Sequence, residues 1–368
     1  MSSSSVSNNG GICQRARPEV LAMAGYSSAR SLQVAESDTT FLDANECAFE
    51  PYVGASGLSR YPSQQPGLLV DAFRRWLDVS SRNLTITRGA DEAIDCLMRA
   101  FCVPALDNVV ICPPTFAMYA QSAVLQGVEV KTAMLNMDFD LDFDAITNTV
   151  DDKTKMIFVC SPNNPTGNLV DGETIIRLCQ TFQGEVLIVV DETYVEFSAR
   201  ETIIKQLDNY SNLVVLRTLS KAFALAGLRC GFTLAQAPII QALLKVIAPY
   251  QIPEPVAQIA AKALSAESLT LLELQVATLN REKETLAEAL QALDGIELVG
   301  DRKANFVLFR YEKAPALMQY LVSQGMLIRD QSKQLNLHNC LRVSIGTEEQ
   351  NQRLMQLINE FKNNEDAA

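Results

Sequence analysis

VLIVVDETY (residues 186–194) and LVVLRTLSK (residues 213–221) are two nearly unbroken apolar runs that each end in polar residues. Strands this apolar are normally covered on both faces of a sheet. Similar runs alternate with helical patterns between about residues 66 and 235: 83–87 before 90–101, 109–112 before 115–125, and 156–160 before 171–182. Such alternation implies parallel pairing through right-handed crossovers. The sequence therefore predicts an α/β fold with a doubly wound, mostly parallel sheet.

The segment PYQIPEP (residues 249–255) interrupts this alternation with three prolines, as an interdomain joint would. A helical pattern follows over 256–293, then strands over 306–310, 326–329 and 341–345, and helices over 314–323 and from 347. This mixture predicts a smaller α+β domain. We divide the chain into a disordered tail (1–12), an N-terminal arm and lid (13–60), a large domain (61–248) and a small C-terminal domain (249–368).

Composition narrows the class of protein. The 368 residues are 48% apolar and 20% charged, which suits a packed core. A net charge of −12 argues against nucleic-acid or acidic-membrane partners, so any anionic ligand needs a local cluster of cations. The nine cysteines include no CxxC pair and indicate reduced thiols. With no secretory signal and no apolar stretch of about 20 residues, we expect a soluble, cytoplasmic protein without a membrane partner.

Polar residues follow three of the predicted strands, at the sheet edge where ligands of open α/β sheets bind. They are Asn164 in the turn SPNNPTG (161–167), Asp191 after the strand 186–190, and Lys221 after the strand 213–216. Taken singly, each has a structural interpretation: the first segment is an ordinary turn, Asp191 caps the next helix, and Lys221 is solvated.

Taken together, these side chains have the chemistry that one cofactor requires. A lysine among small and apolar residues loses its proton readily and attacks an aldehyde, and a buried carboxylate needs a cation. Pyridoxal phosphate needs that lysine for a Schiff base, that carboxylate for its ring nitrogen, and donors for its phenolic oxygen and phosphate. Backbone N–H groups at residues 89–92, which open a helix, would meet the phosphate. Neither GxxxxGK[ST] nor GxGxxG follows a strand, and the single His338 argues against a histidine-based metal site.

The chain also resembles the fold-type I pyridoxal-phosphate aminotransferases of class II, and most closely the histidinol-phosphate aminotransferase family. The shared stretches span nearly the whole chain in order: LDANE (42–46), RYP (60–62), RGADEAI (88–94), PPTFAMY (113–119), CSPNNPTG (160–167), DETYVEF (191–197), RTLSKAFALAGLRCGFTLA (217–235), KVIAPY (245–250), IRDQSKQ (328–334) and CLRVSIGT (340–347). The nineteen-residue lysine segment is the most specific of them.

The resemblance implies a role for each matching residue. Lys221 would form the Schiff base and move the proton, Asp191 would pair with the ring nitrogen, and Asn164 with Tyr194 would bind the phenolic oxygen. The implied phosphate-binding residues are Ala90, Asp91, Ser220, Arg229 and, from the other subunit of a homodimer, Tyr61. Phe116 stands where this family usually has a tyrosine stacked on the cofactor ring.

The resemblance also implies the reaction and its substrates. Amino transfer between L-histidinol phosphate and 2-oxoglutarate would give imidazole-acetol phosphate and L-glutamate, in histidine biosynthesis. Arg342, assisted by Arg329, would bind the substrate anions, while Tyr26 and Asn45 would line the substrate side. From the residues alone, the two arginines are equally well explained as exposed charges at strand ends. Cys47-Ala48 replaces the usual family pattern after Asn-Glu, which implies a different backbone turn in the lid.

Two further hypotheses remain open from the sequence, of which the first covers two other reactions. The same fold also supports decarboxylation of threonine phosphate and transamination of aromatic amino acids. A non-catalytic ligand sensor is the third hypothesis, although the first 60 residues contain no basic helix-turn-helix pattern.

Overall fold

The computed structural model describes residues 11–24, 45–47, 49, 58–198 and 202–366. Its larger sheet has seven strands in the order β1-β7-β6-β5-β4-β2-β3. Their bounds are β1 Leu84–Thr87, β2 Asn108–Ile111, β3 Glu129–Thr132, β4 Thr154–Cys160, β5 Leu187–Asp191, β6 Leu213–Thr218 and β7 Gly231–Ala235. Neighbours from β3 to β6 pair in parallel, and β7 is antiparallel to both β6 and β1. The predicted α/β, mostly parallel sheet is confirmed.

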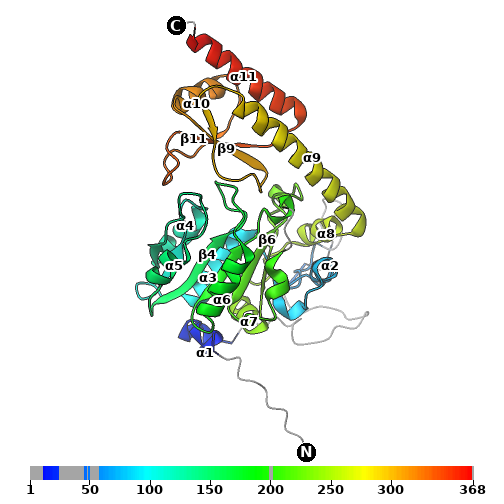
Figure 1. Ribbon diagram of the computed structural model, residues 1–368. Helices are drawn as coiled ribbons and strands as arrows, with labels where there is room; N and C mark the ends of the chain where they lie inside the picture. Colours follow the sequence, from blue (N-terminus) through cyan, green and yellow to red (C-terminus); the bar gives the residue numbers. More distant parts are fainter. Residues whose placement is uncertain (1–10, 25–44, 48, 50–57, 199–201, 367–368) are drawn as a thin grey trace, which may run out of the picture.

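Helices cover both faces of this sheet, as the apolar strands predict (Figure 1). In β5, Leu187 and Val189 pack into one apolar cluster, whereas Ile188 and Val190 pack into another on the opposite face. The first cluster includes side chains from α3 (Ala90–Phe101), α4 (Met118–Leu125) and α7 (Ala237–Val246). The second includes side chains from α2 (Gly67–Leu77), α5 (Phe143–Thr149), α6 (Gly172–Thr181) and α8 (Glu254–Ala263).

The C-terminal part forms a four-stranded antiparallel sheet in the order β10-β11-β9-β8. Its strands are β8 Ile296–Leu298, β9 Phe306–Tyr311, β10 Arg329–Asp330 and β11 Cys340–Ser344. The long helix α9 (Ala266–Gln291) extends from the larger sheet to this one, where α10 (Ala314–Ser323) and α11 (Glu348–Asp366) join it (Figure 1). Short elements complete the described structure: α1 Pro18–Ala22 and the 3-10 helices η1 Cys13–Arg15, η3 Ser81–Asn83, η4 Val195–Phe197, η5 Ile203–Gln206 and η6 Ala226–Leu228.

Three local expectations differ from the structure. The helical pattern over 256–293 forms two helices, because Ser265 caps α9 by accepting a hydrogen bond from the Ser268 N–H at 3.2 Å. The strand expected over 326–329 is reduced to Arg329–Asp330. The strands β3, β7 and β8 and the helices α1, α2, α5 and α7 are additional to the predicted elements. Within the described ranges, no helix is both long and apolar enough to cross a membrane.

Candidate active site

A cavity of about 220 Å³ lies where β4, β5 and β6 end, beside the start of α3. Ten of the predicted site residues line it: Ala90, Asp91, Phe116, Asn164, Asp191, Tyr194, Ser220, Lys221, Arg229 and Arg342. Cys160, Thr193 and Thr218 complete the lining. A larger cavity of about 480 Å³, between α2 and η5, contains none of the predicted residues. The fold therefore brings the chemistry-bearing side chains of three strand ends into one pocket.

Asp191, at the end of β5, is 3% exposed and receives three hydrogen bonds. Its Oδ1 accepts from the Thr193 N–H at 3.0 Å and from the Thr193 hydroxyl, and its Oδ2 accepts from the Tyr119 hydroxyl at 2.7 Å. Burial raises the pKa of Asp191, although these donors oppose the shift. Asp191 forms no ion pair with any residue in the described ranges. The bonds to Thr193 stabilise the turn after β5. The next helix begins at Val195 with Tyr194 as its N-cap, so Asp191 does not cap it.

Lys221 follows β6 and is partly buried, with its Nζ 5.4 Å from the centre of the Tyr194 ring. Burial lowers the pKa of Lys221, and the positive charge of Arg342 lowers it further. The neutral, nucleophilic amine is therefore more accessible than for a lysine in water. The Tyr194 ring packs edge-on against Phe306, and burial raises the pKa of its phenol, so Tyr194 remains a hydrogen-bond donor at neutral pH.

The start of α3 lies at the same cavity, which Ala90 and Asp91 line, and the first N–H groups of a helix have no partner within the helix. Gly89 takes the N-cap position with φ 85°, and no side chain caps the helix. Arg229 donates to the Ser220 hydroxyl at 3.3 Å and pairs with Asp91 at 3.1 Å. A Cβ on Gly231 would lie 2.6 Å from the carbonyl carbon of Gly89, so a glycine is required where β7 passes this turn. Helix N–H groups, a hydroxyl and a guanidinium together suit a bound anion.

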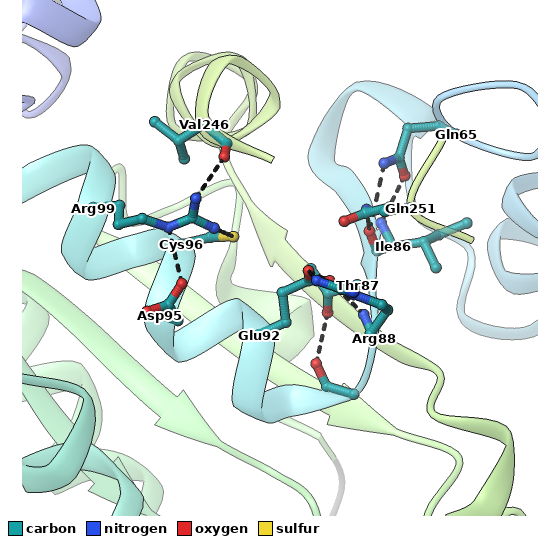
Figure 2. A network of polar contacts seen from close by, with 11 residues as sticks. Gln65, Ile86, Thr87, Arg88, Glu92, Asp95, Cys96, Arg99, Val246 and Gln251 are labelled. Atoms are coloured by element: carbon teal, nitrogen blue, oxygen red, sulfur yellow. Dashed lines mark hydrogen bonds and ion pairs between the residues drawn. The ribbon is translucent and has the colours of Figure 1, made fainter. Parts of the chain in front are cut away.

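The segment that leads into α3 is held in place by polar contacts from both sides (Figure 2). The Thr87 hydroxyl donates to the Gly89 carbonyl at 2.9 Å, and Arg88 pairs with Glu92. The side chains of Gln65 and Gln251 both bond to the backbone of Ile86. These contacts fix the N-terminus of α3.

Asn164 and Arg342 meet across the two sheets. Arg342, on β11, donates a hydrogen bond to the Asn164 side-chain oxygen, and its guanidinium lies 5.1 Å from the centre of the Phe306 ring. The turn that holds Asn164 is fixed by its neighbour Asn163, whose side chain donates to the Thr166 hydroxyl and to the Pro114 carbonyl, each at 2.9 Å. An amide and a guanidinium are thus positioned at the mouth of the strand-end pocket.

Arg329 lies opposite Arg342 in the β10–β11 register, and the two line a second cavity of about 580 Å³. Arg329 is exposed, whereas Arg342 is partly buried. Burial lowers the pKa of Arg342, and Arg329 adds to the effect. Two cations in directly opposed positions repel each other, which favours an anion between them.

Comparisons with known proteins agree with this arrangement. A model of the class I and II aminotransferase family matches residues 55–358. The chain belongs to this aminotransferase family. It is 51% identical to a histidinol-phosphate aminotransferase of Pseudoalteromonas atlantica over 91% of each chain, and 42% identical to one of Yersinia enterocolitica over 95% of this chain and 93% of that one.

Solved aminotransferase structures share the fold. A histidinol-phosphate aminotransferase from Clostridium acetobutylicum superposes with a TM-score of 0.76 at 24% identity, covering 83% of this chain and 92% of that one. One from Sinorhizobium meliloti, in complex with pyridoxal-5'-phosphate, gives 0.75 at 23% identity, with 83% and 84% covered. The predictions of an aminotransferase and of pyridoxal phosphate as its cofactor are confirmed by the family.

Three predicted residues that the structure describes do not line the pocket of this aminotransferase. Tyr61 is half-exposed and stacks on Tyr250, with ring centres 4.6 Å apart. Asn45 has a left-handed backbone, with φ 55°. Arg329 reaches only the second cavity, and Tyr26 lies outside the described residues. The roles predicted for these four residues stay predictions.

The sequence analysis missed the contribution of Tyr119, and it did not single out Cys160, Thr193 or Thr218. Tyr119 lies in an otherwise apolar stretch and therefore resembles a core residue. A usable signal exists, however, because a buried tyrosine hydroxyl normally has a hydrogen-bond partner. Here that partner is Asp191, 72 residues away in the sequence.

Proposed function

We propose that the protein is a homodimeric histidinol-phosphate aminotransferase that uses pyridoxal phosphate. It would transfer the amino group between L-histidinol phosphate and 2-oxoglutarate and give imidazole-acetol phosphate and L-glutamate, in histidine biosynthesis. The observation that carries this proposal is the 51% identity, over 91% of both chains, to a protein of that name. The pocket at the strand ends supports it independently.

The donor set of Asp191 suits the ring nitrogen of the cofactor. Thr193 supplies two donors to Oδ1 and Tyr119 supplies one to Oδ2. A carboxylate has about four acceptor positions, so one is left without a donor in the described part of the chain. A protonated ring nitrogen would provide both that donor and the cation that a buried carboxylate needs.

The other end of the cofactor would lie at the start of α3. Backbone N–H groups of Ala90 and Asp91, with Ser220 and Arg229, would hold its phosphate. Phe116 would stack on its ring, and Asn164 and Tyr194 would bond to the phenolic oxygen.

A few side chains would carry out the proton transfers of the reaction. When bound, pyridoxal phosphate acts as an electron sink for the carbanion that forms when an amino acid loses its α-proton. Lys221 would act as the base, because its lowered pKa favours the neutral amine, which can take up the α-proton and then donate it again. Asp191 would supply the negative charge that pairs with the ring nitrogen, and its burial would strengthen that interaction.

The substrates would bind through local cations, since the chain as a whole has a net charge of −12. Arg342 and Arg329 would hold the phosphate of histidinol phosphate in one half-reaction and a carboxylate of 2-oxoglutarate in the other. Tyr26 and Asn45, from the N-terminal arm and lid (13–60), would close over the substrate.

The assembly and location complete the proposal. Tyr61 would reach the cofactor phosphate of the other subunit in a dimer. The large domain would comprise residues 61–248 and the small domain residues 249–368. Cytoplasmic location suits the free cysteines, of which Cys47 is exposed and seven others are buried in the described ranges.

Two measurements test this proposal. Borohydride reduction of the protein loaded with pyridoxal phosphate should fix the cofactor to one lysine, and peptide mapping should identify Lys221. Keto-product formation from histidinol phosphate with 2-oxoglutarate should then exceed that from phenylalanine, with no decarboxylation of threonine phosphate. A tenfold or greater preference in kcat/KM for either rival substrate, about 1.4 kcal/mol, contradicts the assignment. Loaded protein that reacts with no amino donor would instead favour the sensor hypothesis.

A further inference from the structure

Tyr119 lies completely buried in the first turn of α4, directly beneath the strand-end pocket. Its ring stacks on Phe158, with centres 4.8 Å apart, and meets the edge of Phe116 at 5.6 Å and 85°. Its hydroxyl points at Asp191 and donates to Oδ2 at 2.7 Å. Tyr119 therefore contacts both the aromatic wall and the carboxylate of the pocket.

The two oxygens of Asp191 are supported differently. Oδ1 takes both of its donors from Thr193, two residues along the same turn. Oδ2 takes its only donor in the described part of the chain from a different element, α4, through Tyr119. The Thr193 bonds fix one oxygen locally, and the Tyr119 bond sets the direction of the other. Removing the Tyr119 hydroxyl would leave Oδ2 without a donor in the described part of the chain.

We propose that Tyr119 is a positioning residue that holds Asp191 ionised and aims its Oδ2 at the ring nitrogen of the cofactor. The proposal rests on the cofactor named under the proposed function. Its physical basis is the cost of a buried charge. Each hydrogen bond to the carboxylate stabilises the ionised form relative to the neutral acid. Without the Tyr119 hydroxyl, the proton shared by the pair moves toward the carboxyl group and away from the ring nitrogen.

The other groups that face Asp191 do not replace this donor. Cys160 on β4 and Tyr194 in the turn after β5 stay neutral, because burial raises the pKa of both. Lys221 attracts the Asp191 charge and Asp91 repels it. Burial and the neighbouring carboxylate raise the pKa of Tyr119 itself well above its usual value, so Tyr119 keeps its proton and remains a donor.

The alternative role for Tyr119 is packing alone. Tyr119→Phe separates the two roles, because it retains the ring against Phe158 and Phe116 and removes only the hydroxyl. Tyr320→Phe is the matched control: its hydroxyl bonds to Glu360 at 3.1 Å on the far side of the small sheet. The readouts are the dissociation constant of pyridoxal phosphate and the nitrogen-15 chemical shift of its labelled ring nitrogen, followed against pH in the loaded protein.

We expect Tyr119→Phe to weaken cofactor binding about tenfold, or about 1.4 kcal/mol, and to make the ring nitrogen lose its proton at a lower pH. Tyr320→Phe should change neither quantity. In an Asp191→Asn background, adding Tyr119→Phe should change the dissociation constant less than twofold, because the hydroxyl acts through the carboxylate.

Two results would overturn the proposal. One is a Tyr119→Phe protein whose ring nitrogen titrates as in the unmodified protein. The other is an equally large loss of cofactor affinity with and without Asp191, which would indicate packing alone. Neither readout requires turnover. Failure to transaminate histidinol phosphate would therefore contradict the proposed function, whereas the nitrogen-15 measurement would still decide the role of Tyr119.

Discussion

Arg329 and Arg342 occupy directly opposed positions on the antiparallel strands β10 and β11, so that two guanidinium groups project from one register pair. Like charges placed opposite each other destabilise a sheet by up to about 1 kcal/mol. A bound anion would relieve this unfavourable pair. This geometry fits an aminotransferase whose two substrates are both anions.

Replacing these arginines should weaken substrate use without lowering the thermal stability of the protein. We expect Arg342→Gln to lower kcat/KM by up to about 100-fold for both histidinol phosphate and 2-oxoglutarate, since a lost charge-assisted bond costs about 1.5–3 kcal/mol. Arg329→Gln should lower it only about tenfold, because this side chain is exposed. Thermal unfolding should show neither variant less stable. Arg310→Gln on β9, which removes the exposed pair with Glu297, is the control and should leave kcat/KM unchanged.

Gly231→Ala should disturb the proposed phosphate site, because β7 passes directly against the turn that begins α3. Its added Cβ would fall 2.6 Å from the Gly89 carbonyl carbon and 2.8 Å from the Ala90 nitrogen, so the start of α3 must move. We expect at least tenfold weaker binding of pyridoxal phosphate and a loss of about 1–3 kcal/mol in the free energy of unfolding. Gly227→Ala, with no atom within 4 Å of the added Cβ, should behave like the parent protein. Unchanged cofactor affinity in Gly231→Ala would show that the turn at Gly89 can move without weakening cofactor binding.

Lys283, on α9, offers a prediction about stability and pH. It is 3% exposed and donates to the Asn280 side chain at 2.8 Å and to the Ala304 carbonyl at 3.0 Å. Burial lowers its pKa from 10.5 to about 8. The unfolded chain therefore binds more protons between pH 8 and 10.5, and the contribution of Lys283 to stability rises with pH across that window.

The measurement compares the free energy of unfolding of Lys283→Met with that of the parent protein at pH 7 and pH 10. From pH 7 to pH 10, the free energy of unfolding of the parent protein relative to Lys283→Met should increase by up to about 3 kcal/mol. Lys262→Met, at an exposed position on α8, should show no such change. A difference independent of pH would mean that Lys283 is not desolvated in the folded protein.

The sequence predicted the sheet and the strand-end residues because both follow from local patterns. The bounds expected for α3, residues 90–101, agree with the structure, since the strand before it and Gly89 define its start. β7 was missed because its reversal of direction depends on pairing with β1 and β6 rather than on its own residues. The break between α8 and α9 was missed because Ser265 lies within an otherwise continuous helical pattern.

The same distinction holds for the pocket. Asn164, Asp191 and Lys221 could be placed together because parallel strands end at one edge of a sheet. The contact between Asn164 and Arg342 could not, since it joins two sheets whose relative placement no local pattern encodes. The pairing of Tyr119 with Asp191 could not either: a buried tyrosine hydroxyl signals that it has some partner, but not that the partner is a residue 72 positions away.

The family usually has a tyrosine at the position of Phe116, and the effect of this difference can be tested. Its ring lines the cavity and is braced edge-on by Tyr119. Stacking of aromatic rings contributes about 0.5–1.5 kcal/mol beyond buried area. We therefore expect Phe116→Leu to weaken pyridoxal phosphate binding roughly tenfold, measured by titration of the cofactor-free protein. Phe116→Tyr keeps the ring, so affinity within threefold of the parent would show that stacking is what the site uses. An affinity gain of tenfold or more would show instead that the missing hydroxyl had a partner in the pocket.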